Sequence, residues 1–161
     1  MKTVINQKVI LTALIVGLIA SVAFIFIQPL FGMLTLTSRH AAAYVKLGEY
    51  DASTALLLSW FVHMSVSVFY ALLSTIIFNV NRTWLVNITQ VVALGWITTL
   101  TATPANEFVV KLITSLQFPD LGTLSAVNTE IGPKLWLHIM FFGVVIAGVW
   151  LLNKNEISKS E

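Results

Sequence analysis

Long apolar runs alternate with shorter polar segments along the whole chain. Four runs predict transmembrane helices, at residues 9–28, 55–79, 84–102 and 135–152. Each approaches or exceeds the roughly 20 residues that a helix needs to cross the hydrocarbon core of a bilayer. The third run contains Asn87, Thr89 and Gln90 and is the weakest of the four. The pattern predicts an all-α, four-helix transmembrane bundle, with residues 1–161 forming a single membrane domain.

The composition supports a protein that is solvated mainly by lipid. Of the 161 residues, 57% are hydrophobic and 10% are charged, whereas about 25% are charged in a soluble domain. The formal net charge of +2 is too small to indicate a nucleic-acid partner, and no basic run is present. The chain has no cysteine, which excludes disulfides, thiolate metal sites and thiol catalysis.

The positive charges near the predicted spans indicate an orientation. Lys2, Lys8, Arg82, Lys154 and Lys159 lie in the termini and in the short link between spans two and three. Cytoplasmic segments are enriched in such charges. We therefore expect a multi-pass protein of a bacterial plasma membrane (inner membrane), with both termini cytoplasmic and the links 29–54 and 103–134 outside.

The N-terminal run also resembles the apolar core of a signal peptide. It extends over residues 9–27, which is longer than the roughly 7–15 residues of a signal core. The length favours a retained span over a cleaved leader.

Both long links contain signals for short helices. Thr37 is expected to cap a helix over 39–47, and Gly48 to end it. Pro104 suits the first position of a second helix over 105–117, which has an apolar and a polar face. Such an amphipathic helix is expected to lie in the headgroup region or to cover the outer mouth of the bundle.

Two spans carry stripes of polar residues. Side chains three or four residues apart share one helix face, and the second span has such a set in Ser59, His63, Ser67, Tyr70 and Ser74. Asn87 and Gln90 lie on a polar face of the third span. Because lipid cannot satisfy polar groups, we expect the two stripes to face each other. They would form interhelical hydrogen bonds or line a narrow polar path or ligand pocket.

His63 and His138 are the candidate ligand-binding residues. Each follows a tryptophan, and both are expected in the outer third of the membrane on helices that run in the same direction. Two imidazoles at similar depth are a ligand set for haem b, or for a copper or zinc ion. The simpler interpretation is interhelical hydrogen bonding. His40 is expected to be a solvated residue of the first outer link.

The layout of the chain repeats. Span, long outer link and span occur twice, and the same number of residues separates Pro29 from His63 and Pro104 from His138. Aligning the two halves gives no more identities than chance. A parallel two-fold arrangement is therefore a hypothesis that rests on the layout alone.

The leading functional hypothesis is a non-enzymatic membrane subunit or scaffold. No Asp or Glu lies within a span, and no phosphate loop or hydrolase motif is present. Small residues allow close helix contacts, and they recur at Ala13, Gly17, Ser21, Gly143 and Ala147. The expected partners are the lipid bilayer and either a second copy or another membrane protein. The alternatives are a haem-binding electron carrier that uses His63 and His138, and a small channel or transporter.

Overall fold

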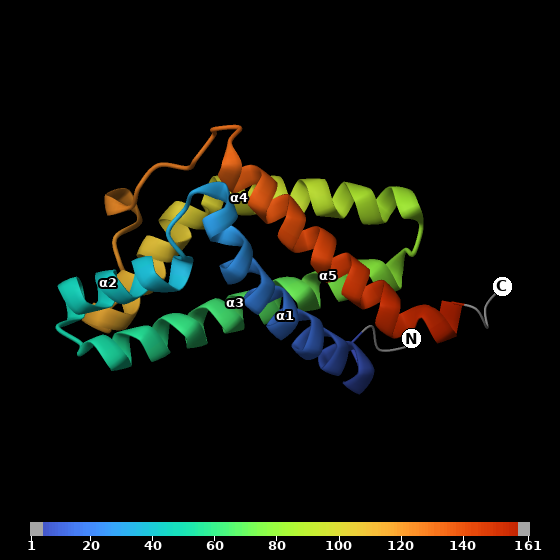
Figure 1. Ribbon diagram of the computed structural model, residues 1–161, viewed down its shortest axis with the longest axis horizontal. Helices are drawn as coiled ribbons and strands as arrows, with labels where there is room; N and C mark the ends of the chain where they lie inside the picture. The colour runs from blue at the N-terminus through green and yellow to red at the C-terminus, as the bar shows by residue number, and fades with distance from the viewer. Residues whose placement is uncertain (1–4, 158–161) are drawn as a thin grey trace.

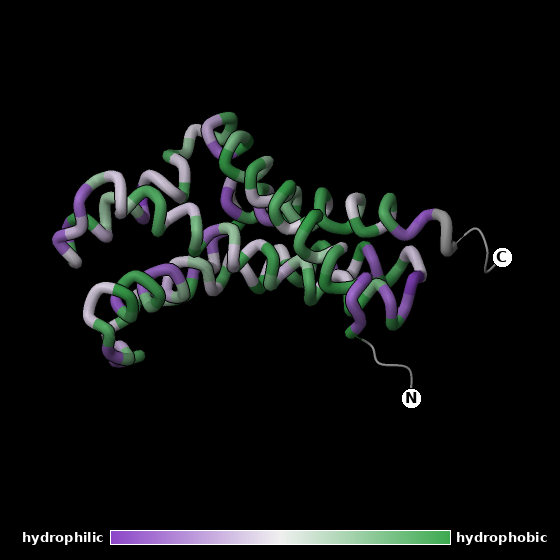
Figure 2. Tube along the Cα trace, turned by 90° about the horizontal axis from the view of Figure 1, so that it is seen from below, coloured by the Kyte–Doolittle hydropathy of each residue, from purple (hydrophilic) through white to green (hydrophobic). Residues whose placement is uncertain are grey.

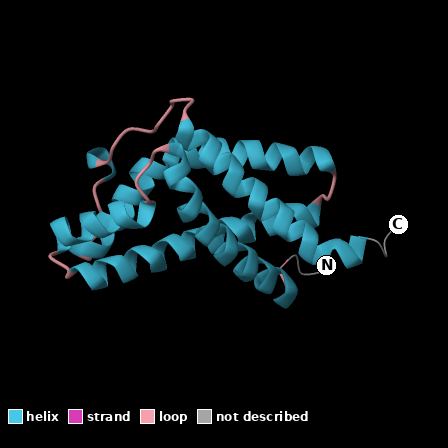
Figure 3. Cartoon of the chain, viewed as in Figure 1, coloured by secondary structure: helices cyan, strands magenta, loops and turns pink. Residues whose placement is uncertain are grey.

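The computed structural model describes residues 5–157, and these form five α-helices and two short 3-10 helices without a strand (Figures 1 and 3). The elements are α1 (Gln7–Ile27), η1 (Gln28–Phe31), α2 (Leu36–Gly48), α3 (Ala52–Val80), α4 (Trp84–Ser115), η2 (Leu121–Thr123) and α5 (Pro133–Ile157). Helices α1, α3, α4 and α5 are long and apolar enough to cross a membrane. The predicted all-α class and the four apolar helices are confirmed. Two of the lysines that predicted the membrane orientation, Lys2 and Lys159, lie outside the described residues.

Two antiparallel helix pairs make up the apolar part of the molecule. Helix α1 packs on α3, and α4 packs on α5, while α1 also contacts α5 (Figure 1). A Cβ atom added to Gly17 would lie 2.6 Å from the Cα atom of Val68. One added to Gly95 would lie 2.9 Å from Ile139 Cγ1 and 3.2 Å from its Cα atom. Each pair is therefore in close backbone contact at a glycine, as is common between transmembrane helices.

Helices α3 and α4 are longer than a bilayer requires. With 29 and 32 residues, they measure roughly 44 and 48 Å at about 1.5 Å per residue, against a hydrocarbon core of about 30 Å. The additional turns of α3 and α4 lie beyond the ends of α1 and α5 and pack against α2. Figure 2 shows hydrophilic residues mainly at the two ends of the long axis, with a mostly hydrophobic stretch between them.

The sequence predicted that the third span ends before Pro104, but the helix continues past this residue. Helix α4 extends to Ser115 without a break, so the prediction of a separate amphipathic helix over 105–117 was wrong. Proline has no N–H and leaves the carbonyl four residues earlier without its helical donor. Here that carbonyl belongs to Leu100, and the backbone N–H of Asn128 donates to it at 3.0 Å. The hydrogen bond from the return loop makes an interior proline tolerable.

The first outer link contains the predicted helix, but it begins and ends differently. The N-cap of α2 is Thr35 instead of Thr37, and its side chain accepts from the backbone N–H of Ser38. Gln28 Oε1 accepts from the backbone N–H of Leu36 at 2.7 Å and so joins the end of α1 to the start of α2. Gly48 is the last residue of the helix, and Glu49 is its C-cap, with a left-handed backbone conformation (φ of 55°).

The glycine contact between α1 and α3 generates a prediction. A Gly17→Val substitution places side-chain atoms against the backbone of α3 and should destabilise the fold by about 1–3 kcal/mol, the usual effect of overpacking. Gly143→Val is the matched control when both variants are compared as monomers, because a Cβ atom there meets nothing within 4 Å in the chain itself. Thermal unfolding in detergent micelles should show a lower midpoint for Gly17→Val alone, and equal midpoints would contradict the close contact.

Candidate functional site: a cavity between the helix pairs

A half-open cavity of about 100 Å³ lies where the two helix pairs meet, at the end of the bundle opposite the start of α1. All five α-helices contribute to its wall. It is lined by Phe24, Leu36, His63, Val66, Ser67, Tyr70, Thr98, Ala102, Ala105, Asn106, Val109, His138 and Phe141. Both histidines singled out in the sequence therefore line one space.

The two histidines lie near the same end of the bundle. His63 contacts α1 at Ser21, six residues before that helix ends, and His138 is five residues after the start of α5. At about 1.5 Å per residue, each is roughly 8–9 Å from the corresponding helix end. The cavity is thus inside the apolar region but close to its boundary.

His63 is held by the backbone of α1. Its Nε2 atom lies 3.1 Å from the carbonyl oxygen of Ser21. A carbonyl can only accept, so Nε2 carries the proton and donates. The Nδ1 atom is left with a lone pair. The side chain is only 6% exposed, and such burial favours a neutral imidazole with one proton and one lone pair.

His138 is held by α4 through a chain of two hydrogen bonds. Its Nδ1 atom lies 2.9 Å from Thr99 Oγ1, and that hydroxyl donates to the carbonyl oxygen of Gly95 at 2.7 Å. A hydroxyl has one proton, so Nδ1 of His138 is the donor to Thr99. In this tautomer, which the hydrogen bond from Thr99 to Gly95 favours, the lone pair is on Nε2. Each histidine thus has one ring nitrogen fixed by a helix and one available as an acceptor.

Phe24 packs against both imidazoles. Its ring centroid lies 5.5 Å from that of His63 and 5.7 Å from that of His138. A haem ligated by both histidines would need this ring to move and would need far more room, since a cavity of about 150 Å³ holds only a benzene molecule. No group of three or more His, Cys, Asp or Glu among the described residues is placed to hold a metal ion.

The polar stripe of α3 packs mainly against α1 and α2, and no hydrogen bond joins it to the third span among the described residues; Thr98 of α4 faces it only across the cavity. Helices α3 and α4 have little contact. Ser67 and Tyr70 line the cavity. Ser59 is fully buried and donates to the carbonyl oxygen of Ala55, within its own helix. Ser74 is also fully buried, and its hydroxyl has no partner among the described residues.

Asn87 and Gln90 lie at the other end of α4, away from the histidines. Gln90 Nε2 donates to Asn87 Oδ1 at 3.0 Å, and Asn87 Nδ2 donates to the carbonyl oxygen of Arg82. Asn87 lines a separate hollow of about 350 Å³ near the start of α4. These two residues do not contribute to the cavity that contains the histidines.

A smaller lobe adjoins the cavity. Its volume is about 50 Å³, and it shares Phe24, Leu36, Ala102, Asn106 and His138 with the larger lobe. Its remaining lining residues include Gln28, Met33, Arg39, Thr103, Lys134 and Leu137. Arg39 and Lys134 were not predicted as site residues, because each lies in a link region where an isolated charge is ordinary.

The position of His40 corrects the sequence interpretation. It is buried in α2, 7% exposed, and neither ring nitrogen has a hydrogen-bond partner among the described residues. Its ring packs edge-on against Tyr44, with centroids 6.4 Å apart. Burial, and then the positive charge of Arg39, lower the pKa of His40 from 6.5 to about 4. The expected solvated loop histidine is instead a neutral buried group.

The lowered pKa of His40 predicts a pH dependence of stability. Between its ordinary pKa of 6.5 and the folded value of about 4, the unfolded chain binds a proton that the folded chain does not. The free energy of unfolding should therefore fall as the pH is lowered through this range, by on the order of 3 kcal/mol. Unfolding midpoints at about pH 7 and pH 4.5 should differ less for His40→Leu than for the natural chain. An identical difference in both proteins would contradict the buried neutral state.

Comparisons of the chain with protein-family models, with curated proteins and with solved structures find no match.

Proposed function

We propose that the chain is a non-enzymatic, multi-pass membrane protein that binds a small amphipathic molecule in the cavity between its helix pairs. The observation that carries this proposal is the composition of the cavity wall. Apolar residues form most of the wall, and a few polar groups from different helices converge on it. Ligand sites in proteins have this character. The hydroxyl of Thr98, 8% exposed, has no partner among the described residues and is available to a ligand.

The polar groups in the wall favour ligands that both donate and accept hydrogen bonds. Nδ1 of His63 and Nε2 of His138 each offer a lone pair, as argued above from their partners. The hydroxyl of Thr98 offers a donor and an acceptor. No carboxylate of the described residues lines the cavity, so these groups are better suited to binding than to paired acid–base catalysis.

The opening of the cavity indicates how a ligand would reach it. Val66 on α3 is 42% exposed, and Ala105 on α4 is also exposed, although both line the cavity. The cavity therefore opens between α3 and α4, which have little contact. Val66 is nearly one turn further along α3 than His63, toward the apolar part of the bundle. A ligand that is dissolved in the bilayer could enter sideways through this opening.

The size of the cavity limits what it can contain. About 100 Å³ accommodates a polar group or one small ring, by comparison with the roughly 150 Å³ that holds benzene. A longer apolar tail would project through the opening into lipid. The haem-carrier alternative requires displacement of Phe24. The channel alternative has less support, because Asn87 and Gln90 lie at the other end of α4 and do not continue the polar lining of the cavity.

Filling the cavity should weaken the binding of an uncharged amphipath. The probe is 1-decanol, and its affinity is obtained from the concentration dependence of thermal stabilisation in phosphatidylcholine nanodiscs. Ala102 lines both lobes, so Ala102→Phe should weaken binding at least about tenfold, which corresponds to about 1.4 kcal/mol. Thr98→Val keeps the shape and removes one hydrogen bond, so a loss of roughly two- to tenfold is expected.

The matched control is Ala93→Phe, the same substitution at an exposed position of the same helix that lines neither lobe. It should bind 1-decanol like the natural chain. Equal affinities of the Ala102→Phe and Ala93→Phe variants would show that decanol acts through the bilayer and would refute the cavity as a binding site.

The membrane-subunit role expected from the sequence is a second candidate, and one helix face favours it. The small-residue face of α1 packs within the chain, since Ala13 and Ser21 are buried and Gly17 contacts α3. The face of α5 is open: a Cβ atom at Gly143 meets nothing within 4 Å, and Ala147 is exposed beside the hollow of about 350 Å³. A helix from a second copy of the chain would fit such a face.

Cysteine cross-linking tests this second candidate cleanly, because the chain has no cysteine of its own. Mild oxidation of membranes should join Ala147→Cys into a disulfide-linked dimer. Ile19→Cys, which is 61% exposed on α1, should stay monomeric. Equal dimer yields from the two variants would indicate random collision and would contradict self-association through α5.

A further inference from the structure

The smaller lobe of the cavity is lined by two cations from different helices. Arg39 lies in the second turn of helix α2, and Lys134 lies in the first turn of α5. Lys134 precedes His138 by one helical turn and so shares its face of α5. The lobe also contains the amide side chains of Gln28 and Asn106. The charge and the donors converge on a space of about 50 Å³.

Nothing acidic in the described part of the chain neutralises these cations. No Asp or Glu of residues 5–157 lines either lobe. Neither Arg39 nor Lys134 forms an ion pair among those residues, whereas Lys111 is paired with Glu107 at 3.0 Å. Both side chains are exposed, so they stand at the solvent-facing rim of the apolar cavity. Two positive charges there, without a counter-charge, attract a negative group.

The local backbone adds to the positive potential. Helices α2 and α5 both begin at this lobe, where Leu36 and Lys134 line it. The N-terminal end of a helix carries a partial positive charge from its aligned peptide dipoles. The two helix ends supplement the side-chain charges, which remain the main basis for anion binding.

We infer that the ligand of the proposed binding site is an amphipathic anion, with a carboxylate or phosphate monoester group held by Arg39 and Lys134. This inference rests on the proposed function and names the ligand class. The two lobes have Phe24, Ala102 and His138 in common in their walls and are therefore neighbours, and the proposed ligand extends across both. Its charged group lies in the smaller lobe, its apolar body lies beside the histidines, and its tail leaves between α3 and α4.

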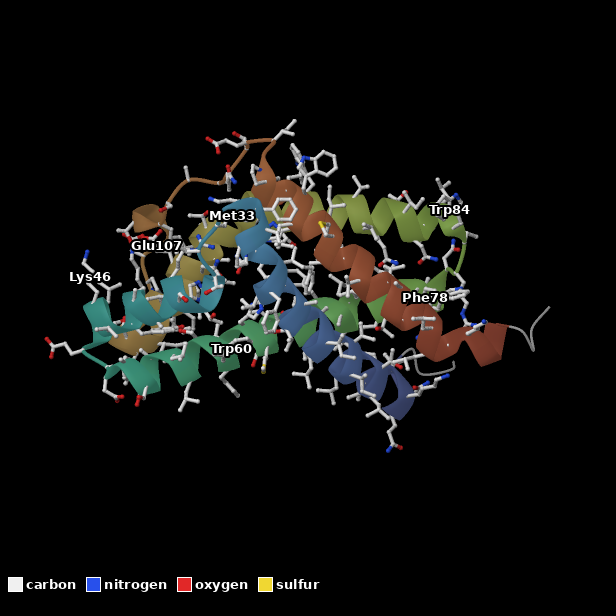
Figure 4. All side chains as sticks on the ribbon, in the orientation of Figure 1. Met33, Lys46, Trp60, Phe78, Trp84 and Glu107 are labelled. Carbon is white, nitrogen blue, oxygen red and sulfur yellow. The ribbon has the colours of Figure 1, made fainter. Side chains whose placement is uncertain are left out.

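The chemistry of the two cations suits such a group. A guanidinium binds a planar carboxylate or a phosphate through two parallel hydrogen bonds, and an ammonium adds a third charge-assisted bond. Figure 4 shows Met33, another residue of the smaller lobe, above the end of α1 and close to α4. This position is near the boundary of the apolar region, where the head group of an amphipath resides.

The test compares four probes on the full chain in phosphatidylcholine nanodiscs: decanoate, decyl phosphate, 1-decanol and inorganic phosphate. At least one of the two amphipathic anions should bind about tenfold or more tightly than decanol, and inorganic phosphate should bind far more weakly. The double variant R39Q/K134Q should remove this advantage while leaving the affinity for decanol unchanged. Whichever anion binds more tightly identifies the head group.

The charge-matched control is K46Q/K154Q, which also removes two positive charges; Lys154 is exposed on α5 and lines neither lobe. Lys46 is exposed at the far end of α2 and lines neither lobe (Figure 4). A loss of anion affinity in this control equal to that of R39Q/K134Q would mean non-specific attraction and would overturn the inference. Equal binding of decanol and both anions would also overturn it, while decanol binding that still depends on Ala102 would leave the proposed function standing. Equal binding of inorganic and decyl phosphate would overturn the amphipathic character of the ligand.

Discussion

The backbone contacts at Gly17 and Gly95 determine where both histidines lie. Each glycine brings one long helix against its partner, and the residue four positions later binds the histidine of that partner: Ser21 for His63, and Thr99 for His138. A larger residue at either glycine would separate the helices and lengthen these hydrogen bonds. In a bilayer, which offers no water to replace them, the close packing and the polar contacts depend on each other.

The continuation of α4 beyond Pro104 completes the cavity. Ala105, Asn106 and Val109 lie after the proline and form part of the wall, so a helix that ended at residue 102 would leave the histidines uncovered. The hydrogen bond from Asn128 to the carbonyl of Leu100 supports this continuation. The return loop is fixed further along, where Glu107 accepts from the backbone N–H of Ser125. The extended helix, α2 and the loop together close one end of the bundle.

Hydropathy was sufficient to predict the four long helices, because each must bury about 20 apolar residues in lipid. It also identified His63 and His138, since ionisable residues in apolar runs are rare. The behaviour at Pro104 could not be predicted, because the hydrogen bond that offsets it comes from a distant loop. The burial of His40 and the convergence of Arg39 with Lys134 likewise depend on how α2 packs against the bundle, for which local sequence carries no signal.

Native mass spectrometry of the chain released gently from its own membranes would examine whether the cavity holds a ligand in the cell. The natural protein should retain an amphipathic anion as an added mass, and the Ala102→Phe variant should lack that mass while Ala93→Phe keeps it. The same added mass on all three proteins, or on none of them, would contradict the assignment of this cavity as a binding site.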